Sequence, residues 1–164
     1  MKIAETLDMK GRLTIQTYNP QAQLVQEVKA DNSIVYTGRE LVAKLFTNQT
    51  IDPIRYIALG TGGSTLVNPA TDTKLGQEVF RKELKPFDLG KDLKKTGEDD
   101  KKCKIMLSVD LDFGEPGNQP VELTEAGLFN SKKTGQGIMY NRVTFDTITK
   151  SDQFKLTLVW EILF

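Results

Sequence analysis

Hydrophobic and polar residues alternate along much of the chain, most regularly at its C-terminal end. Residues 154–164 place large apolar side chains at every second position: Phe154, Leu156, Leu158, Trp160, Ile162 and Phe164. Successive side chains of a β-strand point to opposite faces of the sheet, so this pattern predicts a strand with one apolar face. Each fully buried side chain of this size contributes roughly 1.5–3 kcal/mol, and we therefore expect that face, including Trp160, to be covered.

Period-two alternation also predicts a strand over residues 105–113, with Asp110 and Asp112 on its polar face. Shorter apolar or alternating segments predict strands over residues 12–18, 24–29, 54–59, 121–129 and 138–148. A chain of about seven or eight short strands separated by turns favours a mainly β fold, an antiparallel β-sandwich. A closed β-barrel is the alternative.

One α-helix is predicted in the N-terminal half of the chain. Thr37 and Glu40 have the spacing of a capping box, with Thr37 as the N-cap. Four apolar residues then share one helical face: Leu41, Val42, Leu45 and Phe46. A helix of about 10 residues is marginal alone in water, so we expect this face to pack against the sheet.

The chain of 164 residues suits one domain with an N-terminal extension. Residues 12–18 and 24–29 flank a turn signal at Asn19-Pro20 and predict a hairpin. An isolated hairpin is marginal in water, so it needs either the chain's own sheet or a neighbouring subunit. We assign residues 1–30 to an N-terminal hairpin or arm and residues 31–164 to the β-sandwich domain. That the hairpin completes the chain's own sheet is the competing interpretation.

Residues 71–84 fit either a short helix or an extended segment, because Gly76 weakens an otherwise helical spacing. On such a helix Glu78 and Arg81 would pair at i, i+3. Residues 85–102 carry charges of both signs and few apolar side chains. That composition is typical of a solvated loop or a long hairpin tip.

Composition excludes several kinds of chemistry. Histidine is absent, which removes the commonest general base and metal ligand. The single cysteine, Cys103, cannot form an internal disulfide. Asp110 and Asp112 are expected to lie on the solvated face of their strand rather than to form a calcium site. The sequence therefore predicts no enzymatic activity, no bound metal and no cofactor.

Charge and hydropathy restrict the partners. Lysine and arginine total 22, as do aspartate and glutamate, so the formal net charge is zero. Nucleic-acid-binding proteins usually carry a basic excess, and we expect no nucleic-acid partner. The apolar runs are far shorter than the roughly 20 residues that span a bilayer, and we expect no membrane partner. A net charge near zero also removes one barrier to self-association.

A glycine-rich loop, Gly60-Thr61-Gly62-Gly63-Ser64, follows the strand predicted over residues 54–59. Such loops bind phosphate when a helix begins there, but the lysine of a P-loop is missing and Asn68-Pro69 predicts a turn. We interpret the loop as a tight turn that needs positive φ angles.

Three short motifs carry a resemblance to a known family: IALGTG at residues 57–62, LGQEVFR at 75–81 and EAGLF at 125–129. With Lys150 and the terminal strand around Trp160, they resemble the head-proximal domains of phage tail or collar fibres. They also resemble short stand-alone tail and baseplate proteins of phages and related contractile injection systems. The similarity spans about residues 32–164. The positions that match the family pattern are Gly60, Gly62, Leu75, Glu78, Arg81, Glu125, Gly127, Leu128 and Phe129.

The resemblance implies a non-enzymatic structural component of a phage virion, since that family suggests no catalytic residues. It favours a tail, collar or baseplate adaptor or fibre-attachment protein. Such a protein assembles as repeated copies with other virion structural proteins and is located in the virion after synthesis in the host cytoplasm. The alternatives are a head decoration protein or a free-standing ligand- or carbohydrate-binding β-sandwich module. Most aromatic residues occupy alternating apolar positions, which indicates core packing rather than a carbohydrate-binding surface.

Overall fold

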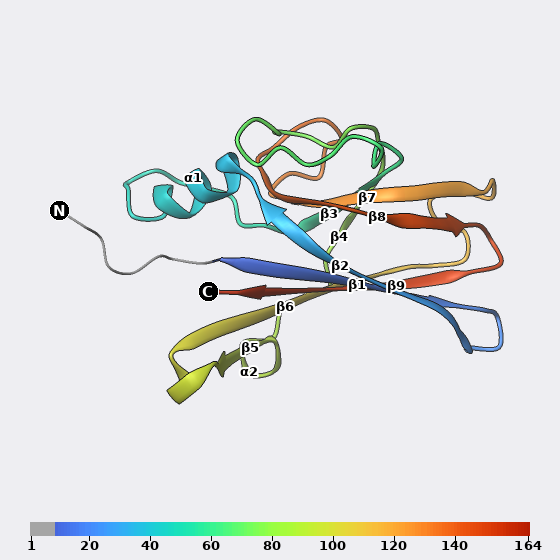
Figure 1. The fold of residues 1–164 in the computed structure, drawn as a ribbon, viewed down its shortest axis with the longest axis horizontal. Coiled ribbons are helices and arrows are strands. Elements are labelled where there is room, and N and C mark those ends of the chain that lie inside the picture. The colour runs from blue at the N-terminus through green and yellow to red at the C-terminus, as the bar shows by residue number, and fades with distance from the viewer. Residues whose placement is uncertain (1–8) are drawn as a thin grey trace.

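The computed structural model describes residues 9–164, which form one antiparallel sheet of nine strands (Figure 1). The strands are β1 (Lys10–Tyr18), β2 (Leu24–Ile34), β3 (Tyr56–Gly60), β4 (Glu78–Glu83), β5 (Leu93–Thr96), β6 (Lys102–Leu111), β7 (Val121–Phe129), β8 (Met139–Lys150) and β9 (Lys155–Leu163). The helices are α1 (Tyr36–Lys44), the one-turn α2 (Leu89–Asp92) and the 3-10 turn η1 (Glu98–Asp100). The strand order is β4-β3-β7-β8-β2-β1-β9-β6-β5.

The predicted mainly β, antiparallel class is confirmed, but the sandwich is corrected to a single sheet curled into a half-barrel. The strand β2 joins the two halves. It pairs with β1 from Leu24 to Asn32 and then with β8 at Ser33 and Ile34. One long strand thus belongs to both halves, and the sheet bends there instead of dividing into two separate layers.

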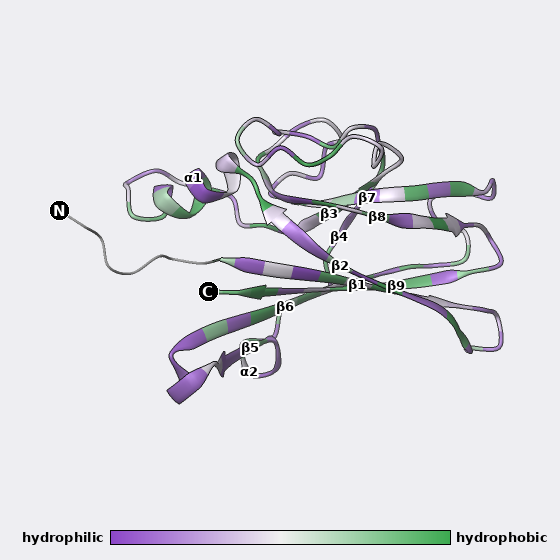
Figure 2. Ribbon diagram, in the orientation of Figure 1, coloured by the Kyte–Doolittle hydropathy of each residue, from purple (hydrophilic) through white to green (hydrophobic). Residues whose placement is uncertain are grey.

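The core lies between the two halves of the curled sheet. Its buried side chains come from β1, β6 and β9 on one side and from β3, β7 and β8 on the other: Leu13, Ile15, Val109, Leu111, Leu158 and Trp160, with Ile57, Leu59, Leu123, Leu128, Val143 and Ile148. The alternation along these strands is visible as green and purple bands (Figure 2). Of the six apolar residues expected on one face over residues 154–164, the four that lie in β9 are buried, whereas Phe154 before the strand is half-buried and Phe164 after it is exposed.

The N-terminal hairpin forms as predicted, but it does not stand apart from the main domain. β1 lies between β2 and β9 and pairs with β9 along its whole length, from Lys10 opposite Leu163 to Tyr18 opposite Lys155. Its buried Leu13 lies opposite Trp160, so its apolar face belongs to the common core. Residues 9–30 therefore complete the chain's own sheet, and residues 1–8 of the predicted arm lie outside the described residues.

Helix α1 is present, but its predicted cap and its apolar face are corrected. The N-cap is Val35, without a side-chain hydrogen bond, and the Thr37 hydroxyl donates instead to the Met139 carbonyl at 2.7 Å. Contact with β8 thus replaces the local capping box. Leu41 is buried, whereas the helix ends before Phe46, whose side chain is 91% exposed.

Residues 71–84 contain no helix, because pairing with β3 holds residues 78–83 as the strand β4. Glu78 and Arg81 nevertheless form an ion pair of 2.6 Å. The charged stretch 85–102, predicted as a solvated loop or a hairpin tip, forms such a tip only at residues 97–101, between β5 and β6; before β5 lies the one-turn helix α2. The stretch adds the short edge strand β5, which pairs with the start of β6 and was not expected from the sequence.

Candidate functional site

The motif residues meet on the outer face of β3, β7 and β8, which the segment 61–77 covers. Glu125 of β7 lies opposite Gly60 of β3 and is fully buried. Its Oε1 accepts hydrogen bonds from the backbone N–H groups of Gly62 (2.9 Å) and Gln77 (2.7 Å). Its Oε2 accepts one from the N–H of Gly76 at 2.9 Å. One carboxylate thereby ties both ends of the covering segment to the sheet.

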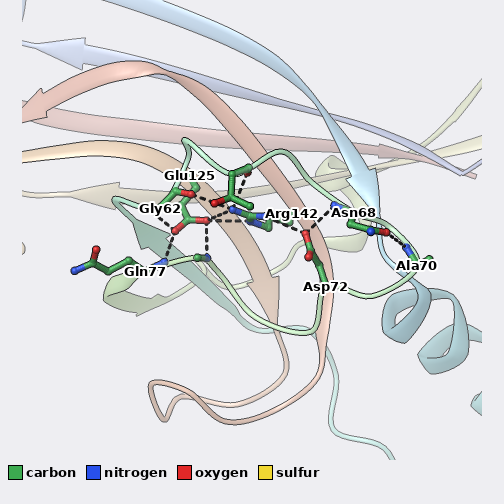
Figure 3. A network of polar contacts seen from close by, with 9 residues as sticks. Gly62, Asn68, Ala70, Asp72, Gln77, Glu125 and Arg142 are labelled. Atoms are coloured by element: carbon green, nitrogen blue, oxygen red, sulfur yellow. Dashed lines mark hydrogen bonds and ion pairs between the residues drawn. The ribbon is translucent and has the colours of Figure 1, made fainter.

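Arg142 of β8 completes this network (Figure 3). Its Nε donates to Glu125 Oε2 at 2.9 Å, and its Nη1 to Asp72 Oδ2 at 2.9 Å. Its Nη2 donates to the carbonyls of Gly62 and Thr65, both at 3.2 Å. The side chain is only 2% exposed, so this buried charge depends on the carboxylates for compensation.

Gly60 and Gly62 are required for space rather than for backbone conformation, which corrects the expectation of positive φ angles. The glycines with positive φ in the described part of the chain are Gly97, Gly135 and Gly137. A Cβ on either Gly60 or Gly62 would come within 2.5 Å of Glu125 Oε1. Both residues lack a side chain because the carboxylate approaches their backbone directly.

A second group of motif residues lies beside Glu125. The Arg81 guanidinium stacks 3.9 Å above the centre of the Phe129 ring, and its Nη1 donates to the carbonyls of Ser131 and Gln136. Leu75 packs against Gly127, where a Cβ would lie 3.1 Å from Leu75 Cδ2. These contacts hold β4 and the 131–137 turn against β7.

The structure therefore brings together the nine residues that match the family pattern, with Leu128 on the core face of β7 and the others on or above its outer face. Their polar groups bind one another and the backbone of two loops. The arrangement holds the segment 61–77 and the 131–137 turn in place on the sheet. Sequence reasoning missed Arg142 and Asp72. A single arginine within the strand predicted over residues 138–148 was the available signal, since a charge in a buried strand needs a partner.

Asp110 and Asp112 do not converge on a common site. Asp110 pairs with Lys85 at 2.8 Å and accepts a hydrogen bond from Thr157 at 2.8 Å, whereas Asp112 is largely exposed. Over residues 9–164, no group of three potential metal-ligating side chains is found. Cys103 is half-buried in β6.

Two carboxylates near the end of β6 make stability depend on acid pH. Burial would raise the pKa of Asp110, but hydrogen bonds from Lys85 and Thr157 bring it below its usual value. Burial likewise opposes the lowering of the pKa of Glu115, which results from the Lys82 hydrogen bond and the Asp112 backbone N–H. A carboxylate with a lower pKa in the folded state stabilises the protein above its unfolded pKa of about 4, and this contribution is lost as pH falls through the folded pKa.

We therefore expect the free energy of unfolding to decrease as the pH is lowered below about 4. The decrease should be less steep in the variant Asp110→Asn with Glu115→Gln. Urea titrations at several pH values measure this slope. Asp146→Asn with Glu122→Gln, at two exposed carboxylates, is the control for the loss of two charges. An unchanged acid slope in the double variant would contradict the prediction.

A groove with a volume of about 1160 Å³ opens beside the core. Its walls are mostly apolar and include Leu41 of α1, Ile105 and Leu107 of β6, and Ile162 of β9. Tyr140 also lines it, and burial raises the pKa of its hydroxyl to about 12. The sequence did not predict this groove, because its walls come from segments far apart in the chain.

Comparisons with protein-family models, with curated proteins and with solved structures find no match for this chain. None of the helices within residues 9–164 is long and apolar enough to cross a membrane. Function is therefore inferred from the motif residues and from the surfaces of the fold.

Proposed function

We propose that this chain is a non-enzymatic structural component of a phage virion, in the role of a tail, collar or baseplate adaptor or fibre-attachment protein present in repeated copies. The observation that carries the proposal is the convergence of the three motifs around Glu125 and Phe129. The motif positions that resemble tail and collar fibre domains are the ones whose contacts hold two loops on the sheet. Motif residues whose contacts hold the fold together, rather than bind a ligand, are what we expect in a family of structural proteins.

The chemistry of the chain supports the same proposal. The whole sequence lacks histidine, so no serine or cysteine has an imidazole base to activate it. Three charged residues are buried in the described part of the chain, and Glu125 and Arg142 are engaged with each other and with backbone groups, while Lys150 donates to the Phe113 and Ser151 carbonyls. A buried, fully hydrogen-bonded ion pair rigidifies the region around it. Rigid attachment of loops to a sheet suits a component of an ordered particle.

The test is association with particles. In lysates of cells that encode the chain and release particles, we expect the protein to sediment with the particles through a density gradient. Immunogold labelling should then mark the tail, collar or baseplate. Labelling of the capsid surface would instead support the head decoration alternative. Particles that lack the protein, with all of it in the unsedimented fraction, would contradict the proposal.

A free-standing ligand-binding module is the second candidate, and the apolar groove favours it. Groove volumes of several hundred cubic ångströms are usual for small-molecule sites. Phe87 and Phe164 at the groove edge are partly exposed, as sugar-stacking residues would be. Saturable binding of an oligosaccharide by the purified protein, together with its absence from particles, would support this second function.

A further inference from the structure

The strand β2 leaves most of one edge unpaired. It pairs with β1 from Leu24 to Asn32, but with β8 only at Ser33 and Ile34. Toward the β1–β2 turn, β2 and β8 diverge (Figure 1). None of the residues 24–32 is buried, and over residues 9–164 no third strand pairs with β2. This part of β2 is therefore an exposed strand edge in the middle of the strand order.

The hydrogen-bond pattern determines which backbone groups face this edge. In an antiparallel ladder, opposite residues alternate between pairs that exchange hydrogen bonds and pairs that do not. Cys103 and Phe164 exchange bonds of 2.8 and 3.0 Å, and the strand registers carry this alternation from β6 through β9 and β1 to β2. The Val35 N–H donates to the Tyr140 carbonyl at 3.3 Å, which gives the same alternation from the β8 side. Three residues of β2 thus direct their N–H and C=O groups to the free edge: Glu27, Lys29 and Asp31.

The two outermost strands of the sheet offer poorer edges. β5 has four residues and carries Lys94 and Lys95, and lysines on a short edge strand oppose pairing with another chain. In β4, the Arg81 side chain is only 2% exposed, because it pairs with Glu78 and donates to carbonyls of the 131–137 turn. Its charge is not available to a neighbour. Of these three edges, β2 is the one that can accept a further strand.

The charges along β2 are self-complementary in one antiparallel register. When Val28 lies opposite its own counterpart in a second copy, Glu27 lies opposite the second copy's Lys29, and the reverse pair forms by symmetry. Opposite charges directly across two strands stabilise their pairing. A two-fold axis at Glu27 or Lys29 would instead bring identical charges together. An axis at Ala30 would place Glu27 opposite Ser33, which is already paired with β8.

Within one copy the same charges are only weakly held. Lys29 Nζ lies 3.3 Å from Glu27 Oε1, and the lysine side chain is 57% exposed. Glu27 Oε2 accepts a hydrogen bond from Gln16 Nε2 at 2.8 Å. An exposed ion pair of this kind contributes little by itself. In the antiparallel register, two such pairs would form a group of four alternating charges, in which each charge keeps its partner and gains a second.

We propose that two copies of this chain pair antiparallel along the free edge of β2, with Val28 at the two-fold axis. The backbones of Glu27 and Lys29 then exchange four hydrogen bonds with the other copy, and the sheet continues from one copy into the next. This deepens the proposed function, on which it rests only for its biological setting, because it names the surface between repeated copies. Self-association of the purified chain is measured without particles, so failure of either proposal leaves the other standing.

Sedimentation equilibrium of the purified full chain with charge variants tests this proposal. We expect a monomer–dimer equilibrium for the unchanged protein. Glu27→Lys and Lys29→Glu each set like charges opposite each other twice in the homodimer, so each should raise the dissociation constant about tenfold or more. A mixture of the two variants should form a heterodimer about as tight as the unchanged dimer, because both facing pairs are again of opposite charge. Loss of the ion pair within one copy cannot produce this recovery.

Two controls separate this contact from the overall charge of the variants. Lys95→Glu changes the same charge on the edge of β5, and it should leave the dissociation constant unchanged. A mixture of Lys95→Glu with Glu122→Lys, at two exposed residues outside β2, carries the same overall charges as the β2 mixture. It should dimerise no more tightly than the unchanged protein. Circular dichroism verifies that each variant is folded.

Hydrogen exchange locates the contact on the backbone. The amides of Glu27 and Lys29 should exchange more slowly as the protein concentration rises, since their N–H groups donate to the other copy. The Lys95 amide, which faces the free edge of β5, should exchange at the same rate throughout. A protein that stays monomeric at all concentrations would overturn the proposal. So would a dimer that the β2 charge variants do not weaken, or a β2 mixture that fails to recover the affinity.

Discussion

Replacement of Glu125 by alanine is expected to lower the free energy of unfolding by about 3–5 kcal/mol, the usual cost of leaving a buried charge without its partner. The variant would deprive Arg142, itself 2% exposed, of one of its two carboxylates. It would also leave the N–H groups of Gly62, Gly76 and Gln77 without their acceptor. These hydrogen bonds are partly buried, so each N–H group left without its acceptor adds part of a desolvation cost.

Urea unfolding of Glu125→Ala measures this loss. Glu122→Ala, three residues earlier on the same strand and exposed, should change the stability by less than about 0.5 kcal/mol. The double variant Glu125→Ala with Arg142→Met should recover part of the loss, because it removes the uncompensated charge. A loss below about 1 kcal/mol in Glu125→Ala would show that the network does not hold the covering segment.

Hydrogen exchange gives a local measure of the same network. In Glu125→Ala, the amides of Gly62, Gly76 and Gln77 should exchange faster than the change in global stability accounts for. Local opening of a segment exposes its amides without global unfolding. Equal acceleration at all amides would indicate that the substitution acts only on the fold as a whole.

Trp160→Ala is expected to destabilise the protein by about 3–5 kcal/mol, the range for truncation of a buried large aromatic residue. Trp160 is 1% exposed in the middle of β9, between Leu13 of β1 and Leu107 of β6. Its indole Nε1 donates to Asn32 Oδ1 at 2.9 Å. Truncation would leave a cavity in the core and also an unsatisfied acceptor on β2.

Denaturant titration and fluorescence test this burial separately. Trp160→Phe keeps most of the packing and should cost less than the alanine variant. Since Trp160 is the only tryptophan, the intrinsic emission of the unchanged protein should be blue-shifted and resistant to iodide. Ready quenching by iodide in the folded protein would place the indole at an accessible surface and contradict the prediction.

Local patterning predicted much of the candidate site's composition but not its geometry. The motifs identified Glu125, Glu78 and Arg81 as positions of interest, and Glu78 and Arg81 do pair, although on a strand. The partner of Glu125 was missed. Arg142 lies 17 residues away in sequence and reaches Glu125 only because β7 and β8 pair in a particular register. Such a register is a non-local property, which local spacing does not report.

The sequence by itself determined which segments become strands where alternation is strong, as in β6 and β9, because a period of two leaves only one apolar face to bury. Tertiary structure decided the elements whose local signals were balanced or weak. Pairing with β3 made β4 a strand despite its helical spacing. The Thr37 hydroxyl donates a hydrogen bond to β8 and therefore does not cap helix α1. The continuity of β2 across both halves, and hence the curled sheet and its groove, depends on contacts between residues far apart in the chain.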